Sequence, residues 1–193
     1  MNALPYVARS ARRLWTDDCA SQMVEFAVSL PLLIVFVVGI FDFSGAYTLK
    51  QKLANAARDS ARSAAADPAT DLGNGGIPAS VSDAFQVVDN YLKAEKLSDC
   101  GVNPTGATQS ALTWTYSANT AGPPPCIFSL AINRGYIAQV TVGPATINVV
   151  QTQVNIQYAY NWHFNSVITV LVPGATYKGQ TVLSTSAVAL NEN

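Results

Sequence analysis

The chain has 193 residues, 11 basic and 12 acidic side chains, and a net charge of −1. This length is sufficient for one membrane segment and one small domain. A near-neutral balance offers no basic surface to a phosphate backbone, so we expect no nucleic-acid partner. The local distribution of charge is more informative than the total.

A membrane-length apolar segment runs from Met23 to Phe43. Three arginines precede it (Arg9, Arg12 and Arg13), and the next basic residue is Lys50. Because short cytoplasmic flanks of membrane helices are positively charged, this asymmetry predicts a cytoplasmic N-terminus and a C-terminal part outside. The segment is longer than the apolar core of a secretory signal and lacks an A-x-A cleavage site, which favours an anchor.

Two carboxylates flank the apolar core of this segment, Glu25 at its entrance and Asp42 at its far end. A charge at the bilayer centre costs roughly 2.5–3.5 kcal/mol, so a retained carboxylate usually has a partner. Residues 26–41 span only about 24 Å as a helix, less than a hydrocarbon core of ~30 Å, which puts both carboxylates near the interfaces. Pro31 removes a backbone hydrogen bond and predicts a kink, and Gly39 is a second flexible point.

The same helix is predicted to continue to about Ala66, because small and apolar residues recur at helical spacing. Arg58 and Arg62 are four residues apart and share one face. A stripe of alanines permits close approach of another helix. Two interpretations of the stripe stay open, a solvated amphipathic helix and a packing surface for neighbouring subunits. The alanines are Ala54, Ala57, Ala61 and Ala65.

The rest of the chain predicts a linker over residues 67–79 and an α+β domain over residues 80–193. Residues 80–97 form an amphipathic helical pattern. Beyond it the sequence alternates and carries few charges, which predicts a small antiparallel sheet of four to six strands with that helix on one face. Residues 163–172 fit a short helix or a further strand. Strands are expected at 111–117, 127–132, 136–142, 149–160 and 180–190, with turns at 133–135 and 143–144.

Cys100 and Cys126 lie in the part placed outside the membrane, where disulfides persist. We expect a bridge that closes a loop of about 27 residues and stabilises the fold by roughly 3–4 kcal/mol. The alternative is two unrelated buried thiols. Cys19 precedes the apolar segment, so it is not a lipoprotein acceptor.

Catalytic chemistry is not expected. The single histidine, His163, lies between two aromatic residues without nearby acids, which favours a packed side chain over a metal ligand. Beyond Cys100 the only acidic residue is Glu192, so paired carboxylates cannot act in the sheet. No phosphate loop, nucleophile elbow or zinc spacing occurs. We therefore expect no enzyme, no cofactor and no metal.

The low charge of the sheet has two interpretations. A surface rich in Thr, Asn and Gln is common where exported proteins contact other subunits, and it also occurs as a plain solvated surface. The sheet edges lack the lysines that discourage edge-to-edge pairing. Partner contact is the favoured interpretation.

The N-terminal region contains V-E-F-A at Val24–Ala27, L-P at Leu30–Pro31, G-I-x-D-F at Gly39–Phe43 and A-A-R-x-x-A-R at Ala56–Arg62. This segment resembles TadE-like proteins, the minor pilins or pseudopilins of tight adherence (Tad) pilus systems. The resemblance implies a single-pass protein of the bacterial inner membrane or of the pilus. Its partners would be other pilins or pseudopilins, the membrane and a prepilin peptidase.

The resemblance also implies cleavage between Ala20 and Ser21, which makes Glu25 the fifth residue of the mature chain. Residues 1–20 would then be the leader, with Ala20 where glycine is usual. After cleavage, the new amine of Ser21 can pair with Glu25 of a neighbouring subunit. Without cleavage, Glu25 is favoured by the positive end of its own helix or by basic residues before it, and a snorkelling interfacial residue is a further alternative.

Together these patterns predict a minor pilin or pseudopilin that takes part in pilus assembly, initiation or tip decoration. The alternative is a membrane-anchored extracytoplasmic adhesion module that does not enter a filament. The expected assembly contacts lie along the N-terminal helix. They are Glu25, Pro31, Gly39, Asp42, Arg58 and Arg62.

Overall fold

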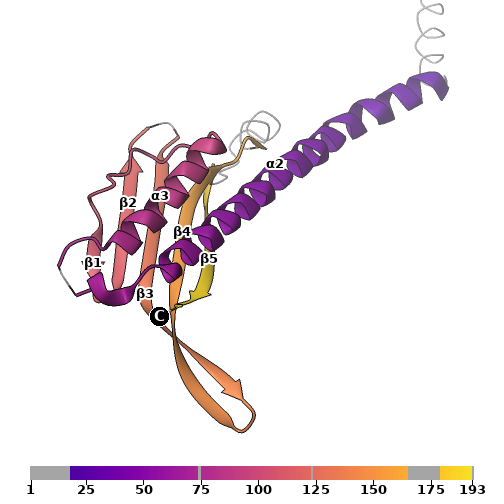
Figure 1. The fold of residues 1–193 in the computed structure, drawn as a ribbon. Helices are drawn as coiled ribbons and strands as arrows, with labels where there is room; N and C mark the ends of the chain where they lie inside the picture. The colour runs from indigo at the N-terminus through magenta and orange to yellow at the C-terminus, as the bar shows by residue number, and fades with distance from the viewer. Residues whose placement is uncertain (1–17, 74, 123, 165–178, 193) are drawn as a thin grey trace, which may run out of the picture. The chain divides into compact units, whose positions relative to one another are not determined.

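Figure 1 shows a computed structural model of the chain, which describes residues 18–73, 75–122, 124–164 and 179–192. It contains helix α2 (Asp18–Ala66), a short 3-10 turn η1 (Ala69–Asp71), helix α3 (Ala79–Ala94) and a five-stranded sheet. The predicted α+β class with a long N-terminal helix is confirmed. The chain divides into two compact units, and the boundary lies inside α2, between Ser44 and Gly45.

The smaller unit contains the described part of α2 up to Ser44 together with His163 and Phe164. The larger unit begins at Gly45 and includes the rest of α2, helix α3 and the whole sheet. The compact domain therefore uses the second half of the long helix and does not begin at residue 80.

The sheet is an antiparallel meander in which every strand pairs with its neighbours in sequence. Its long central strands, β3 and β4, are joined by a tight turn at Gly143, which has φ +63°. Glycine adopts this left-handed conformation without steric cost. The strands are β1 (Thr108–Ser110), β2 (Thr113–Thr120), β3 (Cys126–Val142), β4 (Ala145–Asn161) and β5 (Gln180–Leu190).

The turn predicted at residues 133–135 is wrong, because β3 continues without interruption through these residues. The pairing register shifts between Asn133 and Tyr136, as in a β-bulge. The Asn133 side chain accepts a hydrogen bond from the Gly135 N–H at 2.9 Å, and a Cβ on Gly135 would lie 2.5 Å from Leu112. Turn-forming residues thus serve a bulge that bends a continuous strand. The segment 163–172 lies mostly outside the described residues.

One face of the sheet packs against both helices (Figure 1). Alternate residues of β2, β3 and β4 point to this face, including Trp114, Leu130 and Ile156, which are almost fully buried. Helix α3 contributes the expected apolar side. The contribution of α2 was not expected, and its core residues include Leu49, Leu53, Ala56, Ala57, Ala61 and Ala64.

The alanine stripe of α2 packs inside its own domain. Ala57, Ala61 and Ala65 are at most 3% exposed, and Ala54 is half-buried. Both interpretations of the stripe, solvated surface and intersubunit contact, are therefore wrong for the three buried alanines. Small side chains here allow the helix backbone to approach the sheet closely.

A buried arginine fastens the end of α2 to the sheet. Arg134 of β3 is 1% exposed, and its guanidinium donates hydrogen bonds to the carbonyl of Ala64 and, at 2.8 Å, to the carbonyl of Asp67. It also donates to Thr152 Oγ1 of β4 at 2.9 Å. Since the last carbonyls of a helix lack intrahelical partners and carry partial negative charge, a cation stabilises this end.

The far ends of β3 and β4 form a two-stranded ribbon. Thr113, where β2 begins, pairs with Asn133, and Leu190, where β5 ends, pairs with Gln151. Beyond these pairs β3 and β4 form strand pairs only with each other among the described strands, and the hairpin extends past the rest of the sheet (Figure 1).

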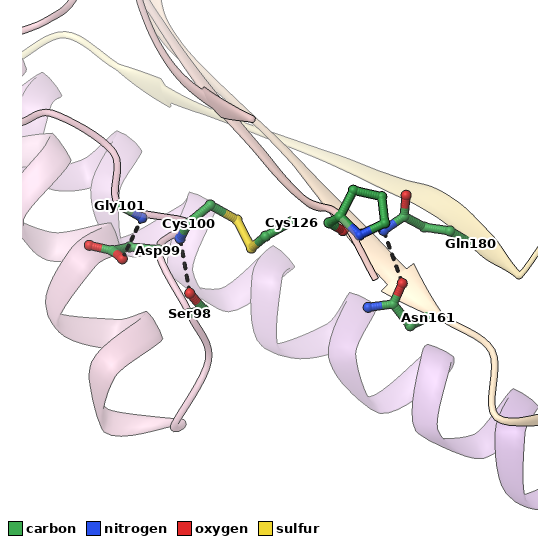
Figure 2. The surroundings of a disulfide bond; sticks show 8 residues. Ser98, Asp99, Cys100, Gly101, Cys126, Asn161 and Gln180 are labelled. Atoms are coloured by element: carbon green, nitrogen blue, oxygen red, sulfur yellow. Dashed lines mark hydrogen bonds between the residues drawn. A yellow bond between two sulfur atoms is a disulfide. The ribbon is translucent and has the colours of Figure 1, made fainter. Parts of the chain in front are cut away.

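The predicted disulfide is confirmed. Cys100, in the turn after α3, is bonded to Cys126 at the start of β3 (Figure 2). Around it, the N–H of Cys100 donates to Ser98 at 3.1 Å and the N–H of Gly101 donates to Asp99 at 3.0 Å. On the other side, Gln180 of β5 donates to Asn161 at 2.9 Å. The bridge therefore links the helical layer to the sheet.

We expect Arg134→Ala to lower the unfolding free energy of the full-length protein in detergent by about 3 kcal/mol or more, because buried carbonyls lose charged donors. Arg134→Lys should recover only part of the lost stability, since one ammonium group cannot replace the several donors of a planar guanidinium. Denaturant unfolding followed by tryptophan fluorescence measures both. The exposed Arg58→Ala is the control, with a change within about 0.5 kcal/mol. Equal effects of Arg134→Ala and Arg58→Ala would contradict the capping role.

Removal of the bridge by the paired substitution Cys100→Ser and Cys126→Ser should lower the unfolding free energy by about 3–4 kcal/mol. The separation of 26 residues sets this value, because the bridge restricts the unfolded chain. Reductant should destabilise the wild type by the same amount as the double substitution does, and it should leave the stability of the double variant unchanged. Cys19→Ser is the matched control, and an equal loss in that variant would refute the assignment.

Burial raises the pKa of Tyr116 to about 12, from an ordinary value of 10.0. The folded state therefore favours the neutral phenol, and this contribution to stability is complete below pH 10 and is lost between about pH 10 and 12. Tyr116→Phe should flatten the alkaline fall in melting temperature, with a remainder from Tyr158, whose pKa is also raised by burial. The exposed Tyr47→Phe should keep the wild-type profile; identical profiles for all three proteins would contradict this account.

Candidate functional site

The first half of α2 is an exposed apolar helix. Within the smaller unit, most of its large side chains are 40–74% exposed. It is long and apolar enough to cross a membrane, since 21 residues from Met23 to Phe43 rise about 31 Å. A surface of this kind is unfavourable in water and requires lipid or other apolar helices around it. The chain therefore carries a candidate membrane anchor at its N-terminal end.

Glu25 lies on this exposed helix, between Val24 and Phe26, which are 65% and 63% exposed. The Ser29 hydroxyl donates to the Glu25 carbonyl at 2.5 Å, so the backbone here has an additional local hydrogen bond. The peptide bond between Ala20 and Ser21 lies inside α2, which begins at Asp18. A peptidase that cuts this bond must therefore act on a helical segment.

The remaining predicted contacts of the first half have different surroundings. The helix continues through Pro31, and Pro31 and Gly39 are half-buried. A Cβ on Gly39 would lie 4.0 Å from the ring of Phe164, so this glycine faces the segment after β4. Their roles in assembly stay predictions.

Asp42 is 5% exposed and is bound within the chain. Its carboxylate accepts a hydrogen bond from the Phe164 N–H at 2.5 Å, and its Oδ1 lies 3.1 Å from Nδ1 of His163. The His163 side chain is 84% exposed, so the expectation of a packed histidine is wrong. Asp42 instead fastens the start of the 163–164 segment to the helix. A carboxylate near the end of an apolar helix thus has a partner in its own chain.

Arg58 and Arg62 lie on the second half of α2, in the larger unit, and both are exposed. With Ala65 they line one side of a cavity of about 740 Å³, and the opposite side is made by residues 187–192 at the end of β5. Their spacing of four residues predicted a shared face, but nothing in the sequence indicated this cavity.

Two functional positions were missed in the sequence. Arg134 was placed in a turn, although a lone arginine within an uncharged sheet is a signal of a specific buried partner. Gly45 was not considered, but a Cβ there would lie 2.7 Å from the hydroxyl of Tyr160 on β4. This glycine permits β4 to approach α2 where the larger unit begins.

The described residues show no group of three or more His, Cys, Asp or Glu side chains that could hold a metal ion. Two features of the structure are candidates for contact with other molecules. One is the exposed apolar half of α2, which carries the exposed Glu25, and the other is the cavity lined by Arg58 and Arg62.

The family model described as "TadE-like protein" matches residues 20–62. The match begins beside the predicted cleavage bond and ends at Arg62, so it covers all six expected assembly contacts. No curated protein and no solved structure gives a significant match to the chain. Residues 20–62 of this chain are therefore similar in sequence to the TadE-like family.

Proposed function

We propose that the protein is a minor pilin or pseudopilin that takes part in the assembly, initiation or tip decoration of a Tad-type pilus. The observation that carries this proposal is the exposed apolar half of α2 with Glu25, which lies within the TadE-like segment. A simple anchor needs apolar length alone, whereas this helix keeps a carboxylate that is costly in lipid.

The proposed location is the bacterial inner membrane, with the N-terminus in the cytoplasm and the larger unit outside. The arginines before the apolar segment support this orientation. The Cys100–Cys126 bridge is consistent with an oxidising compartment. We further propose that the protein has no catalytic activity and acts through contacts with other pilins or pseudopilins.

In the proposed mechanism, apolar helices of several subunits pack side by side and Glu25 pairs with a positive group of a neighbour. If the bond before Ser21 is cut, that group is the new amine. The pairing lowers the cost of the carboxylate in an apolar environment and fixes the register between helices. A prepilin peptidase is the partner that this arrangement requires.

A second candidate function is a membrane-anchored adhesion module. The β3–β4 ribbon favours it, because Ile137, Val140 and Ile147 are 38–60% exposed there. The two strands contain no charged residue other than Arg134. An isolated hairpin of this kind is marginally stable in water and gains from a partner.

Glu25→Ala separates the two functions. We expect normal membrane insertion but at least about tenfold fewer surface filaments, because a desolvated charge pair contributes about 1.5 kcal/mol or more. Sheared filaments from the native host are counted by immunoblot, and membrane fractions give the amount inserted. Gln22→Ala, one turn earlier on the helix, is the matched control. Unchanged filaments with lost surface adhesion would instead establish the adhesion module.

N-terminal sequencing of the protein recovered from cells identifies the partner of Glu25. A sequence that begins at Ser21 supports pairing with the mature amine. A sequence that begins at Met1 excludes that pairing and leaves the helix end, the preceding basic residues or a snorkelling interfacial position of Glu25.

A further inference from the structure

The cavity between α2 and β5 has the form of a groove with one helical and one strand wall. Arg58, Arg62 and Ala65 line the helical side, and six consecutive residues, 187–192, line the other. All of these residues belong to the larger unit. A wall of consecutive residues means that the backbone of the strand is accessible from the groove.

The strand wall is the free edge of the sheet. Among the strands that the structure describes, β5 is the last, and it pairs there only with β4. Among the described residues, one backbone hydrogen bond crosses the groove, from the Glu192 N–H to the Ala65 carbonyl at 3.2 Å, beyond the end of β5. β5 contains no lysine, proline or charged residue that would discourage pairing. An extended peptide can therefore add a strand at this edge.

The helical wall carries two arginines that lack a carboxylate in the described part of the chain. The salt bridges found there involve Lys52, Lys93 and His163, not Arg58 or Arg62. Arg134, the other described arginine, is occupied by the helix end. Guanidinium groups bind carboxylates in a planar, two-point geometry. The groove thus combines a template for backbone pairing with two available positive charges.

We propose that this groove binds an extended acidic segment of a partner protein. The segment adds a strand to β5, and two of its carboxylates pair with Arg58 and Arg62. Residues four apart on a helix are separated by about 6 Å along its axis, and residues two apart on a strand by about 6.6 Å. The spacing favours a D-x-D pattern. Glu192 lines the same groove, and its N–H donates to the Ala65 carbonyl, so its negative charge disfavours a further acid at that end.

The acidic segment comes from a different protein. None of the five described strands contains Asp or Glu, so these strands of a second copy cannot supply the carboxylates. A lipid headgroup could pair with the arginines but would leave the edge of β5 unused. This proposal does not depend on a role of Glu25 or on entry into a filament.

The test uses the full-length protein in detergent micelles and fluorescence polarisation with labelled peptides. The probes are Thr/Val-rich heptapeptides with a central D-x-D and varied flanks, beside matched peptides with Asn for Asp. A third set carries N-methyl groups on alternate residues, which keep the charges but block strand pairing. We expect the Asn and N-methyl sets to bind at least about tenfold more weakly, a loss of about 1.4 kcal/mol.

The matched protein variants are the double substitution Arg58→Gln and Arg62→Gln, its Arg→Lys counterpart and the control Lys50→Gln. The Gln pair should lose about tenfold or more in affinity, the Lys pair should retain part, and Lys50→Gln should bind like the wild type. Both arginines are exposed, and circular dichroism with the melting temperature checks that the variants are folded.

Five outcomes would overturn the proposal, and the first three are no binding by any D-x-D peptide, binding that the Gln pair does not weaken, and equal binding of the N-methyl set. The fourth is arginine-dependent binding to vesicles that contain an anionic phospholipid without binding of the peptides, which would identify a lipid site. Self-association of the protein that the Gln pair abolishes, without peptide binding, would point to a second copy and also overturn it.

Discussion

The guanidinium of Arg134 holds the described domain together at one point. It joins the end of α2 to β3 and β4. The Thr152 hydroxyl in turn donates a hydrogen bond to the side-chain oxygen of Asn191, after β5, at 2.6 Å. A charge buried this deeply is stable only when its donors find acceptors. The position of the helix on the sheet, and with it the groove beside β5, depends on this arrangement. Arg134 is the one charged residue in the five described strands.

Much of the architecture could be predicted from local patterns. The apolar run, the TadE-like motif and the disulfide follow from residue types at short spacing. The alternation at residues 149–160 reports one buried face, and the structure buries Val154 and Ile156 there. These features are determined by the chain within a few turns or strands, so a single sequence suffices to find them.

Other features could not be predicted, because they depend on residues distant in sequence. Asn133, Arg134 and Gly135 have the composition of a turn, and only the pairing with β2 and β4 makes them a bulge. The alanines of α2 indicate that another element approaches the helix closely, but they do not identify that element as the sheet of the same chain. The groove combines Arg62 with residues at the opposite end of the chain, and neither segment alone indicates a binding site. The contact of His163 with Asp42 joins residues 121 positions apart, so no local pattern in the sequence indicates it.

The order of the elements along the chain has a consequence for biogenesis. In a meander each strand finds its partner next to it in sequence, so successive hairpins can form from local contacts as the chain is synthesised. Helix α2 is different, because Ala64 meets Arg134 only 70 residues later. Until β3 has been synthesised, the small-residue side of α2 has no sheet to cover it. The interval between synthesis of α2 and synthesis of β3 is therefore the stage at which this domain is most exposed to aggregation and proteolysis.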